Sequence, residues 1–302
     1  MTSLNDTINS LLQNKESMQQ QAIGVIRVTG SDSKKFLQGQ ITCDINKLTQ
    51  KDSLYGAICS IKGRIITNFY IAQKDEDILI LMSQDLVEKS LLHLKKYAVF
   101  FKVELDDISH ELNVFANVSP PTQTSVPTLS SEQLETNTAY SDMIVITLCK
   151  HPIQLQWHIV AHNKAMTESN IELDALSLLA AKPLIRLEHS ENILPQWLNM
   201  QRTGGISFTK GCYTGQEIVA RMQYKGKSPK QLALFTSEGN IDSTSQVTDD
   251  EGKNIGSIIN ATRLAGTTYC QIILNIAPRD ARNVFVDGEK LLNYPLPYEL
   301  EG

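Results

Sequence analysis

Residues able to do chemistry are concentrated between Lys210 and Arg221, where the chain reads Lys-Gly-Cys-Tyr-Thr-Gly-Gln-Glu-Ile-Val-Ala-Arg. Thr214 and Glu217 are three positions apart and precede an apolar run. This is the spacing of a capping box, in which the hydroxyl and the carboxylate each accept a hydrogen bond from the other residue's backbone amide. The pattern predicts a helix that starts at about Gly215.

Cys212 is the candidate reactive group of this segment. It precedes the expected helix N-terminus, whose partial positive charge stabilises a thiolate, and the ammonium of Lys210 two residues upstream acts in the same direction. Gly211 and Gly215 allow a positive φ or the close approach of a ligand to the backbone. The alternative is a helix cap beside a buried and inert cysteine, since free cysteine is among the most buried residue types.

The elements that must position this segment are expected to form three units, over residues 1–110, 111–226 and 227–302. Apolar patterning and turn residues give the first unit a β-α-β-β-β-α-β order. Its expected elements are a strand at Ala22–Val28, a helix through Phe36 and Leu37, a hairpin of Ser53–Ile61 and Ile65–Ala72, a strand at Ile78–Met82, a helix at Gln84–Val99 and a strand at Phe101–Leu105.

The second unit carries the signature segment, and the third reads as a small barrel because its short strands are separated by Gly, Asn and Asp. In the second unit, Pro183–Gln201 lacks a clean period, which indicates an irregular segment. The other expected elements are strands at Glu111–Val118, Met143–Leu148 and Leu155–Ala161, a helix at Ile171–Ala181, and barrel strands at Gln231–Phe235, Gly256–Ala261, Tyr269–Leu274 and Asn283–Val286. The fold class is therefore α+β.

Composition narrows the function classes. The chain has 302 residues, a formal net charge of −5 and 20% charged residues, and no apolar run approaches the length of a membrane span. The first residues, Met1 to Gln21, are polar, so we expect no secretory signal and a cytoplasmic protein with no membrane partner. Five cysteines without a Cys-x-x-Cys pair predict no zinc site and no iron–sulfur cluster of the chain's own.

The segment from Lys210 to Arg221 resembles the signature of the YgfZ family of folate-binding proteins, which are relatives of the glycine-cleavage T-protein, a folate-dependent aminomethyltransferase. The resemblance runs in order from about residue 22 to the end of the chain. It is carried by Phe36–Gln40 with Asp44, Lys62–Arg64, Lys95–Phe100, Gly204–Phe208 and Pro295–Tyr298. It implies two related mixed α/β, ferredoxin-like units that form a folate-binding core, followed by a C-terminal β-barrel.

The resemblance also implies a functional centre. Lys210 and Cys212 would be its reactive pair, and tetrahydrofolate or a derivative would be its ligand. The residues implied around the ligand are Gly211, Tyr213, Thr214, Gly215, Gln216, Glu217, Arg221, Lys62, Arg64, Gln38 and Gln40. From local sequence alone, Lys62–Arg64 is equally an ordinary turn, and Gln38 and Gln40 are equally helix-end caps.

Three departures from the family pattern concern five positions. Leu179 stands where members commonly have a Glu that binds the pterin ring, and Ile23 and Leu173 stand where some members flank the folate with tryptophan. These changes remove hydrogen-bond acceptors and stacking surface. Thr67-Asn68 stands where the T-protein enzymes carry Asp-Asp, and neither side chain can act as that acid at neutral pH.

Three hypotheses remain open. The chain is an accessory protein that supports iron–sulfur enzymes such as tRNA methylthiotransferases, or a folate-dependent one-carbon transferase, or an RNA- or protein-binding scaffold. A basic cluster near the expected helix bears on the third hypothesis. Its positive charge can attract an anion, either the phosphate backbone of an RNA such as tRNA or the glutamate tail of a folate. The alternative is that the cluster is only a solvated surface. The cluster comprises Arg221, Lys225, Lys227 and Lys230.

Overall fold

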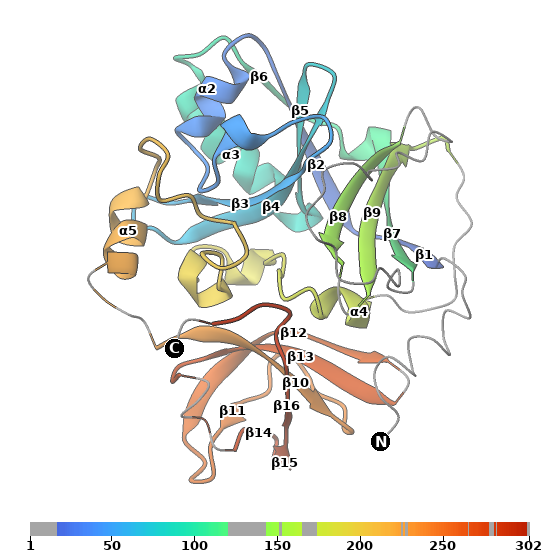
Figure 1. Cartoon of the computed structure of the whole chain (residues 1–302), viewed down its shortest axis with the longest axis vertical. Coiled ribbons are helices and arrows are strands. Elements are labelled where there is room, and N and C mark those ends of the chain that lie inside the picture. Colours follow the sequence, from blue (N-terminus) through green and yellow to red (C-terminus); the bar gives the residue numbers. More distant parts are fainter. Residues whose placement is uncertain are drawn as a thin grey trace, which may run out of the picture.

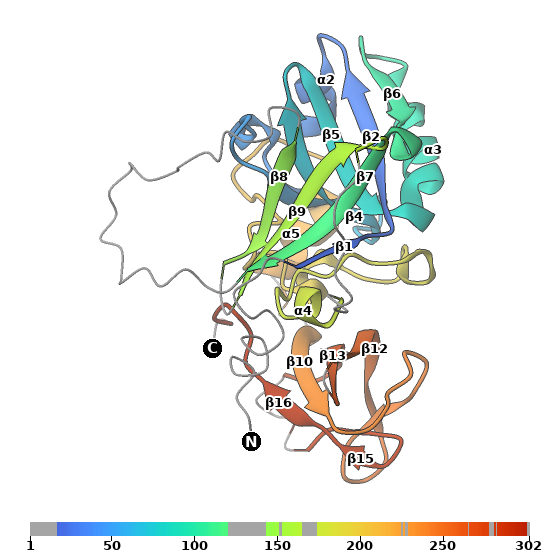
Figure 2. The same cartoon turned by 90° about the vertical axis from the view of Figure 1, so that its right-hand side faces the viewer.

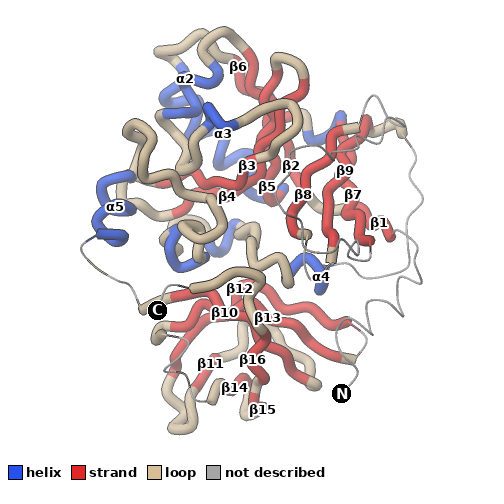
Figure 3. Tube along the Cα trace, in the orientation of Figure 1, coloured by secondary structure: helices blue, strands red, loops and turns tan. Residues whose placement is uncertain are grey.

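The computed structural model describes residues 17–119, 143–150, 153–164, 174–224, 226, 229–264, 266–277, 281 and 283–300. Leu173, Lys225 and Lys227 lie outside the described residues, as does the start of the helix expected at Ile171–Ala181. Within the described ranges, no helix combines the length and apolarity needed to cross a bilayer. Strands and loops make up most of the molecule, and its helices are short (Figure 3).

The first sheet has five antiparallel strands in the order β3-β4-β5-β2-β6. Helix α2 (Ser33–Gln38) follows the first strand, and helix α3 (Val87–Ala98) precedes the last. This is the order of elements expected from the sequence. The strands are β2 (Ile23–Thr29), β3 (Leu54–Cys59), β4 (Ile65–Lys74), β5 (Asp77–Ser83) and β6 (Glu104–Asp107).

Apolar patterning explains these elements. The first eight residues of β4 are all buried and six of them are apolar, so the segment lacks the alternation of a half-buried strand. Helix α3 buries Val87, Ser90 and Leu94, at the spacing of one helix face. A short 3₁₀ turn at Gln84–Leu86 leads into it.

The second sheet has the order β1-β7-β9-β8 and lies beside the first (Figures 1 and 2). Its edge strand β1 (Ser17–Gln20) comes from the segment that the sequence assigned to the first unit. It pairs antiparallel with β7 (Leu112–Ser119), and the chain then enters β2 of the first sheet within two residues. The remaining strands are β8 (Ile144–Cys149) and β9 (Gln154–Ala161).

A seven-stranded, barrel-like sheet forms the third unit, with its own core around Val247, Ile272 and Val286. This confirms the expected mixed α/β class with a C-terminal barrel, while the ferredoxin-like description of the first two units stays a prediction. The barrel strands are β10 (Gln231–Ser237), β11 (Val247–Thr248), β12 (Asn254–Leu264), β13 (Thr267–Leu274), β14 (Phe285–Val286), β15 (Glu289–Lys290) and β16 (Leu292–Tyr294).

An irregular segment lies between the two upper sheets and the barrel, drawn in yellow in Figure 1. It begins with helix α4 (Asp174–Leu178), which ends three residues before the end expected for the helix at Ile171–Ala181. The part from Pro183 to Gln201 contains 3₁₀ turns at Leu187–His189 and Pro195–Leu198, as the absence of a clean period indicated. Side chains tie it to the barrel: Gln271 Nε2 donates to the carbonyl of Leu178, and Asn199 Nδ2 donates to that of Leu232. The segment therefore joins all three sheets.

Candidate functional site

Helix α5 (Gln216–Tyr224) begins one residue after the expected position. The Thr214 hydroxyl donates to Gln40 Oε1 at 3.4 Å, and the Thr214 amide donates to the carbonyl of Gly39 at 3.2 Å. Thr214 is thus used to dock the segment onto the first unit rather than to accept from Glu217, and Glu217 is exposed. The helix was predicted correctly, but the capping-box contacts expected for Thr214 are replaced by contacts to residues 39 and 40.

Gly215 and Gly63 form the closest contact between the signature and the first sheet. Both have positive φ, +82° and +70° respectively. A Cβ on Gly215 would overlap the carbonyl oxygen of Ser60, and a Cβ on Gly63 would lie 2.8 Å from Ile218 Cβ. The tip of the β3–β4 hairpin therefore packs against the start of α5 through Gly63, whereas the Lys62 side chain is exposed.

Lys210 holds the backbone of the first unit. Its ammonium donates to the carbonyls of Ile41 at 2.7 Å and Cys43 at 2.9 Å, and lies 5.1 Å from the centre of the Tyr213 ring. Burial lowers the pKa of Lys210 to about 8, against smaller opposing effects of Cys43 and Asp44. A lysine with such a pKa supplies a neutral amine more readily than an exposed one, which suits a general base or a nucleophile.

Cys212 is exposed, in contrast to the buried and inert alternative considered for it. Cys43 and Cys59 are buried, and burial raises the pKa of each thiol to about 12. Tyr213 is also buried, which raises the pKa of its phenol, and its hydroxyl has no hydrogen-bond partner among the described residues. Cys212 is thus the most accessible thiol of this region.

The remaining signature and helix-end residues divide between structural and exposed positions. Gln38 is structural: it donates to Asp44 Oδ1 at 2.9 Å and accepts from the amide of Ile45 at 3.1 Å, and so closes the turn that follows α2. Gln40 is buried and accepts from Thr214. The exposed positions are Lys62, Gly211 and Arg221, and Gln216 is half-buried.

Arg64 and Lys230 meet at one side chain, although they are far apart in sequence. The Arg64 guanidinium lies 4.8 Å and the Lys230 ammonium 4.3 Å from the centre of the Trp197 ring. Arg64 also donates to the carbonyl of Asn192 at 2.9 Å. These contacts fix two cations beside α5, because each is held by the same aromatic ring.

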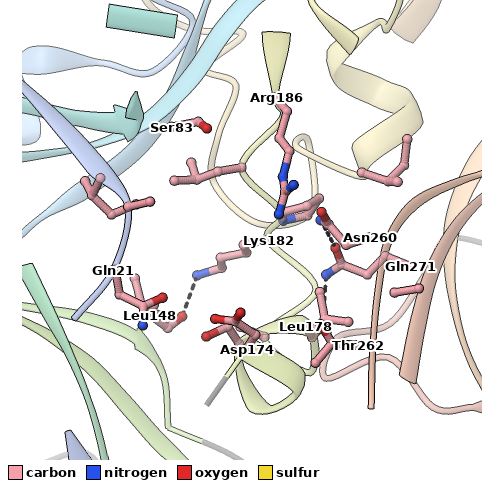
Figure 4. Close-up of a pocket in the computed structure, with 18 of the residues that line it drawn as sticks. Gln21, Ser83, Leu148, Asp174, Leu178, Lys182, Arg186, Asn260, Thr262 and Gln271 are labelled. Atoms are coloured by element: carbon pink, nitrogen blue, oxygen red, sulfur yellow. Dashed lines mark hydrogen bonds between the residues drawn. The ribbon is translucent and has the colours of Figure 1, made fainter. Parts of the chain in front are cut away.

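A separate cavity of about 530 Å³ opens where the three units meet (Figure 4). Its wall includes Tyr70 and Trp157, whose rings pack edge to face at 5.0 Å, and Ile23 at the start of β2. On the barrel side, Asn260 donates to Gln271 at 2.9 Å. The size lies within the range of small-molecule sites, which are mostly apolar with a few placed polar groups.

The signature residues and the cavity do not coincide. None of the residues named from the family resemblance as ligand contacts lines this cavity, whereas Ile23, at a position expected to flank the ligand, does. Leu179 is buried in the core and does not line the cavity; its neighbours Leu178 and Ala180 do. Position 179 has no carboxylate, but the cavity wall has one in Asp174, at the start of α4, the helix that ends just before Leu179.

Sequence reasoning missed the polar groups of the cavity. Asp174, Lys182, Arg186, Asn260 and Gln271 line it, and they come from α4, the irregular segment and two barrel strands. No local spacing connects the first three to the last two, because they meet only through the packing of the irregular segment on the barrel. The one available signal was a pair of cations at positions 182 and 186 within an otherwise apolar stretch.

Asn68 occupies the position where an acid would be expected in an aminomethyltransferase. It is fully buried, and its amide donates to the Tyr55 hydroxyl at 2.9 Å and to the carbonyl of Pro183 at 2.6 Å. Its Oδ1 accepts from the amide of Ile185 at 2.8 Å. The side chain therefore joins the first sheet to the irregular segment, and Asn68 does not line the cavity.

Comparison with known proteins shows to which family the chain belongs. Residues 7–156 match the model of the GCVT N-terminal domain. The tRNA-modifying protein YgfZ of Colwellia psychrerythraea is 33% identical over 244 residues, which cover 77% of this chain and 74% of the relative. The chain belongs to the YgfZ family. Another member, the tRNA-modifying protein YgfZ of Escherichia coli strain SMS-3-5, is 30% identical over 300 residues, or 91% of this chain and 90% of its own.

The family relationship extends to the fold of the T-protein. The crystal structure of the glycine cleavage system aminomethyltransferase T from Bartonella henselae superposes with a TM-score of 0.66. The match covers 97% of this chain and 89% of that chain at 14% sequence identity. The YgfZ chain described here therefore has the aminomethyltransferase fold.

Proposed function

We propose that this chain binds a tetrahydrofolate-class ligand in the central cavity and supports the modification of tRNA by iron–sulfur enzymes such as methylthiotransferases. The observation that carries the proposal is the cavity itself, a ligand-sized space at the junction of three units in a member of the YgfZ family. Tyr70, Trp157 and Ile23 supply apolar surface for a bicyclic ring. Asp174 supplies a carboxylate able to accept N–H donors.

In this proposal Cys212 is the reactive residue, and it acts outside the cavity. The thiol is exposed at the N-terminal side of α5, and Lys210 holds the backbone that supports the same loop. Exposure suits a group that meets another macromolecule. Among the described residues, no group of three His, Cys, Asp or Glu side chains is placed to hold a metal.

Complementation tests the role of Cys212. In a bacterial strain that lacks its own YgfZ-type protein, the wild-type chain is expected to restore methylthiolated tRNA, and Cys212→Ser is expected to lower that restoration at least about tenfold. Mass spectrometry of tRNA nucleosides provides the measurement, and Cys149→Ser serves as the thiol control. Full restoration by a folded Cys212→Ser protein would contradict the role, and failure of the wild type would contradict the function.

We also propose that the face beside α5 contacts the phosphate backbone of RNA. Its cations are Arg64 and Lys230, both held on Trp197, and the exposed Arg221 of α5. Their preset positions lower the ordering cost of phosphate contacts, and Arg and Lys dominate such contacts. Helix α5 lies at the outer side of the molecule in Figure 1, where a large partner can reach it.

Charge reversal tests this interaction. Arg64→Glu with Lys230→Glu is expected to weaken the binding of a fluorescent tRNA at low salt at least about tenfold. The slope of log affinity against log salt is expected to fall by about 1 for each phosphate that the variant no longer neutralises. Lys74→Glu, an exposed change at the end of β4, is the control. Equal tRNA affinity and salt slope in both variants would exclude this face as an RNA-binding surface.

A further inference from the structure

The cavity wall contains a short segment, residues 182–186, whose backbone is fixed by side chains of the first sheet. The Tyr55 hydroxyl donates to the carbonyl of Pro183 at 3.0 Å, and Asn68 holds the Pro183 carbonyl and the Ile185 amide. Lys182 and Arg186 flank this anchored stretch, and both line the cavity. Figure 4 shows the two side chains extending from the same segment into the space. The backbone from which both side chains extend is therefore fixed, which reduces the conformational entropy lost when the side chains bind a ligand.

Neither cation is neutralised within the described structure. The Lys182 ammonium is half-buried, and its one described hydrogen bond is a 3.4 Å contact to the carbonyl of Leu148. Burial lowers the pKa of Lys182, as expected for an ammonium removed from water without a carboxylate beside it. Among the residues that the structure describes, no ion pair involves Lys182 or Arg186.

Three carboxylates also line the cavity, but two of them are engaged elsewhere. Asp242 accepts from the amide of Thr244 at 2.8 Å and from its hydroxyl at 2.6 Å. Glu188 is largely exposed and lies 3.7 Å from His189 Nε2. Asp174 remains, at the start of α4. The cavity thus offers an acceptor at α4 and two donors with unused N–H groups on the segment from 182 to 186.

We infer that Lys182 and Arg186 form the subsite for a carboxylate of the ligand. This inference rests on the proposed ligand binding in the central cavity and names the chemistry of one end of that ligand. An ammonium has three N–H donors and a guanidinium five, so each cation keeps donors for a carboxylate oxygen that enters the cavity. The half-buried position of Lys182 strengthens its charge-assisted hydrogen bond, because less water competes for it, whereas the exposed Arg186 adds a second set of donors at the mouth of the cavity. For a tetrahydrofolate-class ligand, the carboxylate is that of its glutamyl tail.

Calorimetric titration with two probes tests the subsite. Tetrahydrofolate has both the ring and the glutamyl carboxylates, whereas 6-methyltetrahydropterin has the ring alone. The wild-type chain is expected to bind tetrahydrofolate at least about tenfold more tightly, the size expected for one charge-assisted hydrogen bond. Lys182→Met with Arg186→Gln is expected to abolish this preference while the affinity for the pterin stays the same. Lys74→Met, outside the cavity, is expected to keep it.

The outcomes separate the subsite from the function. Equal affinities of the wild type for the two probes, or an unchanged preference in the double variant, would overturn the subsite and leave ligand binding in the cavity intact. Absence of binding of both probes to the wild type would overturn both proposals. If the double variant does not fold, the subsite is tested instead with Lys182→Arg and with the salt dependence of wild-type binding. The arginine variant is expected to keep the preference, and added salt is expected to weaken tetrahydrofolate binding more than pterin binding.

Discussion

Replacing Gly215 by alanine is expected to destabilise the protein by about 3 kcal/mol or more. The backbone there has a positive φ, and there is no room for a Cβ. The φ of +82° disfavours any L side chain, and the added methyl group would overlap the carbonyl oxygen of Ser60. The strain can be relieved only if α5 moves away from the β3–β4 hairpin. Urea unfolding of the variant is expected to show a lower midpoint, and limited proteolysis is expected to cut first in the signature.

Gly211→Ala is the matched control for this prediction. It lies in the same signature, a Cβ there would meet no atom within 4 Å, and its φ is outside the positive range. Its unfolding midpoint is expected to equal that of the wild type. If both variants are equally stable, the packing of Gly215 on Ser60 does not contribute to stability, and the two glycines would have to be explained by ligand contacts instead.

Substitution of Asn68 is expected to have the second large effect on stability, because all of its described hydrogen bonds are to other buried groups of the protein. Asn68→Leu leaves the buried Ile185 amide without its partner and removes one of the two donors to the Pro183 carbonyl, at a cost of about 3 kcal/mol or more. Asn68→Asp restores the acid type of the T-protein enzymes but places a carboxylate oxygen against the Pro183 carbonyl. We therefore expect Asn68→Asp to lose stability as well, and to gain no aminomethyltransferase activity.

The pH dependence of Asn68→Asp distinguishes a buried carboxyl from a general packing defect. Burial raises the pKa of the introduced carboxyl, and the protonated form can donate to the Pro183 carbonyl as Asn68 does. The variant's stability relative to wild type is thus largest at low pH and is lost as the pH rises through the folded-state pKa. Urea midpoints at pH 5 and pH 8 provide the measurement, with the exposed Asn46→Asp as control. A pH-independent difference would contradict this explanation.

The fold was largely predictable because its signals are local. Buried runs such as Ile65–Lys74 and the apolar stripe of α3 follow directly from side-chain type and spacing, and so did the start of α5 to within one residue. The placement of β1 was not predictable, because four residues at a sheet edge, three of them polar, carry no apolar pattern. Their partner, β7, lies on the far side of the first unit in sequence.

The site was predictable only where one segment contains it. The exposed Cys212 and the glycine at position 215 were visible in the signature, and the structure gives each a physical setting. The cavity was not visible, because Asp174 and Lys182 of the second unit meet Asn260 of the barrel only in the folded chain. Leu179 illustrates the difference: the sequence placed it at the ligand, whereas packing buries it and presents Asp174 on the cavity wall instead.

The crossing of the chain from β1 to β2 has a consequence for synthesis. The ribosome releases β1 first, yet its partner β7 emerges only after the whole first sheet. The first sheet can fold before β1 has a partner, because all strands of the first sheet have been synthesised once β6 is complete. Residues 19 to 23, which span the crossing, also line the cavity. We therefore expect cavity closure to be a late event in biogenesis, because it requires that the second sheet has first paired with its N-terminal strand.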